Sequence, residues 1–526
     1  MLHRARLSDH HSIIEHRYEK AAELARQGVP LFPNRYVPSH SCQQVLDAYE
    51  SLDASRQSVR VAGRMMAIRR MGKAIFCHLL DASGRIQVYA RRDNLPEADF
   101  ERLKDLIDLG DFLGVEGTVF TTKTGERSIE ATAVTLLSKS MRPLPEKYHG
   151  LKDTEIRYRQ RYVDLFANPE VRDIFRRRAA IVASIRRQLD GLGYLEVETP
   201  MMQPIHGGAS ARPFVTHHNT LDMPLYLRIA PELYLKRLLV GGFERVYEIN
   251  RNFRNEGIST RHNPEFTMLE LYTAWWDYRD TMELTERLLR QAAQDAGVQG
   301  PVTFGEHTID LLPEAPWRRI SVLEGIREVT GLELDWSMSA AQVRQAAAGR
   351  VHVPGGPDAA AKESHEAGTG ADHIMAIFEE NVEKTLVQPT FVIEYPAVLS
   401  PLAKARPDNP AVAERFELYI GCIEVANAYS ELNDPGLQFH HFENQLKRRE
   451  AGDQEAQAMD EDYVRALEYG MPPASGLGIG IDRITMLCTG QTSIREVILF
   501  PLLRQEVATA PEAGAPSDAP APTPEG

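Results

Sequence analysis

Residues 244–276, ERVYEINRNFRNEGISTRHNPEFTMLELYTAWW, decide the fold. They contain two strand-like runs, 244–256 and 264–276, joined by a polar loop. Side chains of a strand alternate between its two faces, so each run should present one face of polar, charged and aromatic groups where a core strand would carry Val and Ile. In chain order, these faces carry Asn252, Arg254, Glu256, Phe266, Met268, Glu270 and Tyr272.

Such a surface would suit a purine nucleotide, with the base held on a ring face and the phosphates held by basic side chains. In the loop between the runs, Arg261 and His262 are placed to reach outward to the distal phosphates. The alternative interpretation is an exposed sheet face with incidental ion pairs. The two strand-like runs therefore predict a nucleotide site and leave this alternative open.

Residues 416–434, FELYIGCIEVANAYSELND, form a second group. Glu417 and Glu424 flank an Ile-Gly-Cys turn that could bring two carboxylates together, and Mg²⁺ with ATP is usually held by one or two carboxylates plus the phosphates. Asn427, Tyr429 and Glu431 alternate onto one face, which would suit a substrate with both a carboxylate and a cation. A buried, unpaired glutamate at position 431 would favour a cationic ligand, because an uncompensated buried charge is costly.

Residues 475–483, SGLGIGIDR, form a third group, followed by an apolar helix. Glycines at 476, 478 and 480 allow close backbone approach, and Arg483 would emerge early in the helix. No βαβ unit surrounds these glycines, so they do not form the dinucleotide-binding pattern. Taken alone, this glycine motif is weakly specific.

The rest of the chain predicts an α+β protein of more than one domain. A chain of 526 residues is too long for one ordinary core. Residues 59–137 contain five short strand-like runs with one helix near 99–109, which fits a barrel of the oligonucleotide-binding (OB) type; a different small β-barrel is the alternative. Residues 169–192 predict an amphipathic helix, and no regular βαβ repeat follows it.

Composition narrows the class of function. The net charge of −14 argues against nucleic acid, yet Asp81 is the only acidic residue between Arg56 and Arg92, a stretch rich in arginine. Such a patch can attract a polyphosphate backbone, although a solvated basic face is the commoner explanation. With no apolar stretch of about 18 to 20 residues, no apolar leader and four dispersed cysteines, we expect a cytoplasmic protein without a membrane span.

Taken together, these segments resemble the class II aminoacyl-tRNA synthetases. The extended GYLEVETP (193–200) after a long helix, FRNE (253–256) with its loop, and GLGIGIDR (476–483) look like motifs 1, 2 and 3 of that family, in the right order. With an N-terminal barrel, the chain is similar to subclass IIb, which contains the lysyl, aspartyl and asparaginyl enzymes. The segments that point to the lysyl enzymes are 207–214, 228–259, 261–272, SPLAK (400–404) and SELND (430–434).

The resemblance implies ATP-dependent activation of L-lysine to lysyl-adenylate and transfer to the 3′ end of tRNA(Lys). It assigns Arg254 and Arg483 to catalysis, and Glu431 with Tyr272 to the ε-ammonium of lysine. The ATP-binding positions would be Arg254, Glu256, Arg261, His262, Phe266, Glu417 and Arg483. The lysine-binding positions would be Gly208, Glu232, Glu270, Tyr272, Asn427, Tyr429 and Glu431.

The resemblance also implies a cofactor and partners. Glu417 and Glu424 would hold Mg²⁺ with ATP, and a homodimer would form through the motif 1 helix. The anticodon of the tRNA would be bound in the barrel by Phe76, Gln87 and Glu126, for which a core role of Phe76 is the alternative. Departures from the commonest family pattern, expected to border the amino-acid pocket, are Ala426, Ala428, Cys422 and Ser475.

Five segments are expected: an N-terminal helical extension (1–55), an OB-fold anticodon-binding domain (56–145), a linker (146–168), a class II catalytic domain with an antiparallel sheet (169–505) and a disordered tail (506–526). A surface insertion is expected near 349–370. Rival functions are a ligase that lysylates a protein, disfavoured by the barrel, and a non-catalytic RNA-binding paralogue, disfavoured because the arginines and carboxylates are all present. Aspartate or asparagine specificity is disfavoured by Glu431.

Overall fold

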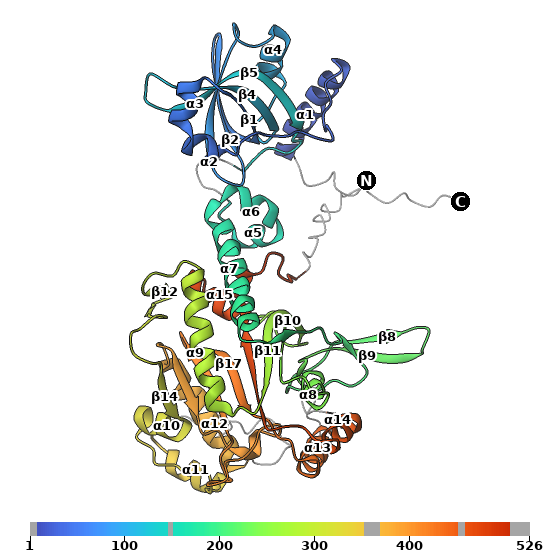
Figure 1. Cartoon of the computed structure of the whole chain (residues 1–526), viewed down its shortest axis with the longest axis vertical. Coiled ribbons are helices and arrows are strands. Elements are labelled where there is room, and N and C mark those ends of the chain that lie inside the picture. The colour runs from blue at the N-terminus through green and yellow to red at the C-terminus, as the bar shows by residue number, and fades with distance from the viewer. Residues whose placement is uncertain (1–7, 146–150, 352–368, 451–457, 505–526) are drawn as a thin grey trace, which may run out of the picture. The chain divides into compact units, whose positions relative to one another are not determined.

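The computed structural model describes residues 8–145, 151–351, 369–450 and 458–504. The chain divides into two compact units, Met1–Lys152 and Asp153–Gly526, and each is described by itself (Figure 1). The tail expected over 506–526 and most of the insertion expected at 349–370 lie outside the described residues. Among the described residues, no helix is both long and apolar enough to cross a membrane.

The first unit is a closed barrel with three preceding helices. The helices are α1 (Ser8–Arg26), α2 (Cys42–Asp47) and α3 (Tyr49–Ser55). The barrel consists of β1 (Ser58–Met71), β2 (Ala74–Leu80), β3 (Arg85–Arg91), α4 (Glu97–Asp105), β4 (Phe112–Thr121) and β5 (Arg127–Ser138), paired in the order β1-β2-β3-β5-β4. The prediction of a small barrel with a helix between its third and fourth strands is confirmed.

The second unit begins with helices where a linker was expected. In the linker expected over 146–168, the described part contains α5 (Thr154–Arg159) and α6 (Arg161–Ala167), which precede α7 (Pro169–Gly191). Arg161 is fully buried; its Nη1 donates to Asp164 at 2.6 Å and its Nη2 to the carbonyl of Arg495 at 2.7 Å. Because Arg161 ties α6 to Arg495, far away in sequence, residues 154–167 are part of the second unit and the linker expectation is wrong there.

An eight-stranded sheet forms the centre of the second unit, in the order β14-β15-β16-β17-β18-β11-β10-β6. The strands are β6 (Leu195–Glu196), β10 (Arg245–Phe253), β11 (Glu265–Ala274), β14 (Arg318–Ser321), β15 (Thr390–Ile393), β16 (Arg415–Ile420), β17 (Ile423–Ser430) and β18 (Ala474–Gly480). All neighbours pair antiparallel except β10 with β6 and β14 with β15. The predicted α+β class with an antiparallel sheet is confirmed.

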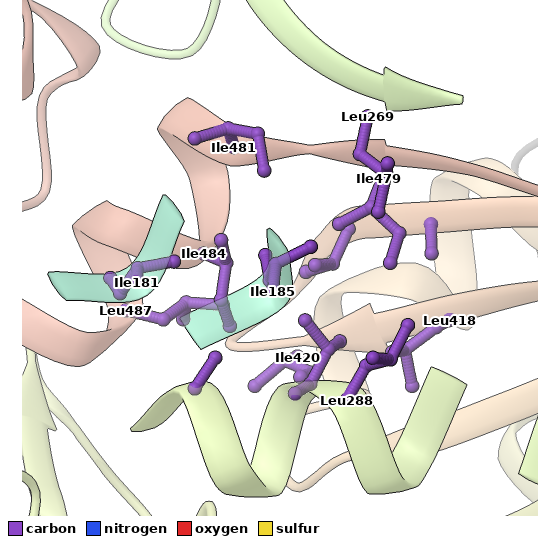
Figure 2. Close-up of a cluster of buried hydrophobic side chains, with 14 of the residues drawn as sticks. Ile181, Ile185, Leu269, Leu288, Leu418, Ile420, Ile479, Ile481, Ile484 and Leu487 are labelled. Carbon is purple, nitrogen blue, oxygen red and sulfur yellow. The ribbon is translucent and has the colours of Figure 1, made fainter. Parts of the chain in front are cut away.

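One face of this sheet is covered by α7, α9 (Tyr278–Asp295) and α15 (Ile481–Thr489). Figure 2 shows side chains of these three helices meeting the inner side chains of the strands, among them Ile185, Leu288, Leu418 and Ile479. Leu269 and Leu271 of β11 are fully buried in this core, so alternation sends Met268, Glu270 and Tyr272 to the other face. The opposite face of the sheet is therefore free to carry polar chemistry.

Further elements surround the sheet. The helices are α8 (Glu232–Val240), α10 (Val322–Thr330), α11 (Ala340–Ala347), α12 (Gly370–Asn381), α13 (Pro435–Glu450), α14 (Glu461–Glu468) and α16 (Ile494–Val497), with short 3₁₀ turns η2 (Glu383–Thr385) and η3 (Ala397–Leu399). The strands β7 (Met202–Gln203), β8 (Val215–His218) and β9 (Met223–Leu227) form one small sheet, and β12 (Val302–Phe304) and β13 (His307–Ile309) form another.

Candidate functional site

A cavity of about 480 Å³ lies on the open face of the eight-stranded sheet. The alternation of β11 and β17 points one set of side chains into it and the other set into the core. The structure brings to this cavity every residue that the sequence proposed for ATP, lysine and metal: Gly208, Glu232, Arg254, Glu256, Arg261, His262, Phe266, Glu270, Tyr272, Glu417, Glu424, Asn427, Tyr429, Glu431 and Arg483. These residues come from segments more than two hundred positions apart in sequence.

Arg254 lies just beyond the end of β10, which stops at Phe253, so it and Glu256 belong to the loop and not to the strand as expected. Its backbone N–H donates to the carbonyl of Pro264 at 2.9 Å, which holds it beside the second strand. The guanidinium lies 5.2 Å from the ring centroid of Phe266, and its Nε has no hydrogen-bond partner among the described residues. Burial lowers the pKa of Arg254, and such a buried cation favours an anionic ligand.

Three further basic groups lie near Arg254. Nη1 of Arg261 donates to the carbonyl of Cys422 at 3.3 Å, and Nη1 of Arg483 donates to the carbonyl of Glu424 at 2.6 Å. Nε2 of His262 lies 3.5 Å from Nη2 of Arg483, and partial loss of solvent together with that guanidinium lowers the pKa of the imidazole. This end of the cavity therefore presents cations and a neutral imidazole, which suits a polyanion.

Glu417 and Glu424 lie on the neighbouring strands β16 and β17, on either side of the tight turn between them. Oε1 of Glu417 accepts from Arg415 at 2.5 Å, and Oε2 accepts from the hydroxyls of Tyr395 and Tyr419, each at 2.8 Å. Burial, and the nearby Glu424, raise the pKa of Glu417.

No group of three or more His, Cys, Asp or Glu side chains that could hold a metal occurs in the described part of the chain. Two carboxylates facing a cavity with cationic walls nevertheless fit Mg²⁺, because this ion takes only one or two protein carboxylates when phosphates and water supply the remaining oxygens. The donor set of Glu417 and Glu424 is therefore compatible with a magnesium–nucleotide complex.

The other end of the cavity is acidic and buried. Glu232, Glu270 and Glu431 are 4%, 5% and 0% exposed. The hydroxyl of Tyr429 donates to Glu232 at 2.7 Å, and the hydroxyl of Tyr272 donates to Glu270 at 3.3 Å. Burial, and the neighbouring Glu232, raise the pKa of Glu270 to about 8. Three carboxylates and two phenols so enclosed form a strong site for cations.

The expectation of an unpaired glutamate at position 431 is wrong, because Glu431 forms an ion pair with Lys236. Nζ of Lys236 also donates to Oε1 of Glu232 at 2.6 Å. Lys236 follows Glu232 by one turn of α8, the spacing at which an acid and a base meet on a helix. Analysis of isolated motifs missed this residue, although the i,i+4 spacing was a signal for it.

Arg415 is a second residue that the motifs did not reveal. It lines the cavity, donates to Glu417, and its Nε donates to the side-chain oxygen of Asn427 at 3.2 Å. It lies two positions before Glu417 on β16, so strand alternation places both on the cavity face.

Crowding at the acidic end of the cavity leaves room only for a glycine at position 476. A Cβ at this position would lie 2.1 Å from Oε1 of Glu431 and 2.5 Å from Cε1 of Tyr272, which is impossible without displacement. Gly208 has a φ of +84°, and a Cβ there would lie 2.8 Å from the Cβ of Glu232. Both glycines therefore make room for the carboxylates that line the cavity.

The residues that depart from the commonest family pattern do not all border the amino-acid pocket as expected. Ala426 and Ala428 are buried in the hydrophobic core, because they alternate with Asn427 on β17, so the expectation that they border the pocket is wrong. Ser475 is fully buried and donates from its hydroxyl to the carbonyl of Tyr429 at 3.0 Å. The carbonyl of Cys422 accepts from Arg261, so this residue lies beside the cationic end.

In the barrel, the three residues proposed for the anticodon lie on neighbouring parts of β2, β3 and the turn before β5, with Gln87 buried and Phe76 partly exposed. Nε2 of Gln87 donates to Glu126 at 2.6 Å, and His78 contacts the other carboxylate oxygen at 2.9 Å. Phe76 is partly exposed and stacks on Tyr89 with ring centroids 4.6 Å apart, whereas the core of the barrel takes its neighbours on β2. This arrangement of a ring beside polar edges suits an unstacked base.

Comparison with known proteins agrees with this geometry. Residues 153–504 match the family model described as tRNA synthetases class II (D, K and N), and residues 59–137 match an OB-fold nucleic acid binding domain. The chain is 53% identical over 493 residues to a lysine--tRNA ligase of Carboxydothermus hydrogenoformans, covering 94% of this chain and 98% of that protein. It is 51% identical over 495 residues to that of Bacillus subtilis, covering 93% and 96%.

A lysine--tRNA ligase of Citrobacter koseri is 50% identical over 508 residues, covering 95% of this chain and 97% of that protein. The similarity thus spans both compact units and nearly the full length of each relative. The chain belongs to the class II tRNA synthetases of the aspartyl, lysyl and asparaginyl group, and within that group to the lysine--tRNA ligases.

Proposed function

We propose that this protein activates L-lysine with ATP and transfers it to tRNA(Lys), with the two ends of its cavity dividing the substrates between them. The observation that carries the proposal is the separation of charge: Arg254, Arg261 and Arg483 at one end and Glu232, Glu270 and Glu431 at the other. Triphosphate and a diammonium amino acid can then bind in only one orientation, which brings the lysine carboxylate toward Arg254.

In the first step, a carboxylate oxygen of lysine attacks the α-phosphorus of ATP, and the bond to pyrophosphate breaks. The nucleophile is already an anion, so no general base is needed. Arg254 holds the attacking carboxylate and the α-phosphate together, because the buried Nε of its guanidinium has no hydrogen-bond partner among the described residues. Phe266 holds the adenine on its ring, and Arg261, His262 and Arg483 hold the distal phosphates.

Glu417 and Glu424 would hold Mg²⁺, which neutralises charge on the phosphates when it is bound. Arg415, Tyr395 and Tyr419 orient the Glu417 carboxylate by donating to both of its oxygens. At the lysine end, Glu431 and Tyr272 would hold the ε-ammonium, and Glu232, Glu270 and the backbone at Gly208 the α-ammonium. Asn427 would assist with the carboxylate.

In the second step, the 3′-hydroxyl of the terminal adenosine of tRNA attacks the carbonyl of the adenylate, and AMP leaves. The barrel would select the tRNA through its anticodon, with a base stacked on Phe76 and its edge bound by Gln87 and Glu126. Because Gln87 and His78 already hold Glu126, its carboxylate is fixed before the RNA arrives.

We further propose a homodimer and a cytoplasmic location. Residues that follow the motif 1 helix expose large apolar side chains, among them Leu195, Met202, Val215 and Leu221 at 46%, 57%, 64% and 64% exposure. Such surface is typical of a subunit interface. The four cysteines are all free and buried, as expected in a reducing compartment.

Charging of tRNA tests the proposal. Purified protein with ATP, Mg²⁺, lysine and a tRNA(Lys) transcript is expected to form lysyl-tRNA. The variant Phe76→Ala should raise the KM for tRNA about 10-fold through loss of base stacking, with lysine-dependent pyrophosphate exchange unchanged. A wild-type protein that forms lysyl-adenylate yet charges no tRNA would contradict the transfer step, and an unchanged KM for tRNA in Phe76→Ala would remove the anticodon assignment.

A further inference from the structure

Lys236 is a buried ammonium group placed behind the acidic end of the cavity. Its side chain is 0% exposed, whereas its two carboxylate partners, Glu232 and Glu431, line the cavity. Nζ lies 2.6 Å from Oε1 of Glu232 and in direct contact with Oε2 of Glu431. The two carboxylates come from α8 and from the residue that follows β17, so one ammonium joins two segments distant in sequence.

The groups whose charges act most strongly on this ammonium are the acids Glu232, Glu431 and Tyr463, while the nearby cation Arg237 pairs with Asp460. Tyr429 lies with its ring 5.6 Å from Nζ and donates to Glu232. Tyr463 of α14 also acts on the ammonium, whereas Glu270 and Tyr272 of β11 lie near its partner Glu431. Although burial lowers the pKa of Lys236, the carboxylates of Glu232 and Glu431 raise it above its usual value, so Lys236 is charged at every pH of interest.

The number of charges is informative. Three carboxylates line the acidic end, and Lys236 offsets one of them, which leaves a charge of −2 when all are ionised. Lysine brings two ammonium groups to this end, while its carboxylate is directed toward Arg254. The filled site is then neutral, and each ammonium replaces the water it loses with a carboxylate.

We propose that Lys236 is a positioning residue for lysine recognition, which holds the Glu232 and Glu431 carboxylates toward the cavity and sets the charge of the site to match two ammonium groups. This inference rests on the proposed assignment of Glu232 and Glu431 to the ammonium groups of lysine. Without Lys236, the closely spaced carboxylates would repel one another and take up protons, and each proton would have to leave before lysine could bind.

The experiment compares Lys236→Met with the wild type by pyrophosphate exchange and by calorimetric binding of lysine. The variant keeps most of the apolar volume and removes the charge. The KM and the Kd for lysine are expected to rise about 30-fold at pH 7, with the KM for ATP within about twofold, because a buried carboxylate loses its partner. The loss should shrink as the pH rises toward 9, since the extra protons are then absent.

Lys139 provides a matched control. It is also buried and joins two carboxylates, with Nζ 2.7 Å from Asp108 and 2.8 Å from Asp111, but it lies in the barrel unit. Lys139→Met should lower the midpoint of thermal unfolding without changing the KM for lysine in the exchange reaction, which needs no tRNA. A purely structural role of Lys236 would give the same pattern as Lys139→Met.

A double variant keeps the test decisive if Lys236→Met fails to fold. Lys236→Met combined with Glu431→Gln removes one positive and one negative charge, so the net charge of the site is unchanged and the double variant should fold better than Lys236→Met. Its KM for lysine should equal that of Glu431→Gln alone within about twofold, because the two residues act as a unit. Additive losses, or an unchanged pH dependence in Lys236→Met, would overturn the inference while wild-type exchange still supports the proposed function. Absence of lysine-dependent exchange in the wild type would overturn the proposed function itself.

Discussion

The two ends of the cavity differ in burial as much as in charge. At the cationic end, Arg261 and His262 are exposed and hold few contacts, which suits phosphates that every nucleoside triphosphate carries. At the acidic end, Glu232, Glu270 and Glu431 are buried and joined to phenols and to Lys236. Burial raises the cost of leaving a carboxylate without a cation, so discrimination among amino acids is concentrated where solvent is excluded.

Arg254, the residue of the cationic end toward which the lysine carboxylate is directed, should give the largest effect. Arg254→Ala is expected to lower kcat/KM for lysine-dependent exchange about 1,000-fold, since charge at the α-phosphate develops beside its guanidinium. Arg251→Ala is the matched control, because Arg251 lies on the same segment, pairs loosely with Glu265 at 3.7 Å and is outside the cavity. A comparable loss of kcat/KM in both variants would show that Arg254 has only a structural role and would contradict its contact with the reacting groups.

Removing the charge of Glu431 should separate the ends most cleanly. Glu431→Gln is expected to raise the KM for lysine about 100-fold, because a buried ammonium would lose its carboxylate, and to leave the KM for ATP nearly unchanged. Steady-state exchange with each substrate varied in turn measures both values. An equal loss for lysine and ATP would mean that the two ends do not divide the substrates.

Steric crowding at the acidic end gives an intermediate effect. Gly476→Ala is expected to raise the KM for lysine about 10-fold, since the new methyl group must displace Glu431 or Tyr272. Gly478→Ala is expected to change the KM for lysine less, because its methyl group would lie 2.9 Å from the flexible end of Met268. Crystal structures of both variants would show whether the carboxylate moves. A greater lysine defect in Gly478→Ala than in Gly476→Ala would contradict the packing described for Glu431.

A dependence of lysine binding on pH is expected to be of about the same size as the effect of Gly476→Ala. Burial and the neighbouring Glu232 raise the pKa of Glu270 to about 8, so this carboxyl holds a proton below that pH. An ammonium favours the ionised carboxylate, so lysine binding should release this proton. The KM for lysine should therefore fall about 10-fold between pH 6.5 and 8, with little change for ATP. Glu270→Gln should flatten this dependence; a wild-type KM that rises over this range would reverse the sign of the linkage.

Much of this architecture could be predicted from the sequence, because it follows from local patterns. The alternation in residues 264–276 placed Phe266, Met268, Glu270 and Tyr272 on one face, and the turn spacing placed Glu417 near Glu424. Strand periodicity acts over neighbouring residues and needs no knowledge of tertiary structure. The same holds for the barrel, whose strands and helix follow one another in sequence.

What the sequence did not predict depends on tertiary pairing. The sequence motifs assigned no role to Lys236, and only packing of α8 beside the residue that follows β17 brings it to Glu431. Ala426 and Ala428 border Asn427 in sequence but face the opposite side of the sheet. The helices within 154–167 were missed because the residues that hold them, such as Arg495, lie more than 300 positions away.

Lysine-dependent pyrophosphate exchange, measured with Mg²⁺ and each amino acid in turn, tests the central claim most directly. Exchange with lysine alone is predicted, because the acidic end is built for two ammonium groups. Exchange with aspartate or asparagine in place of lysine would contradict the assignment of the two ends. A failure of all amino acids to support exchange would contradict it as well.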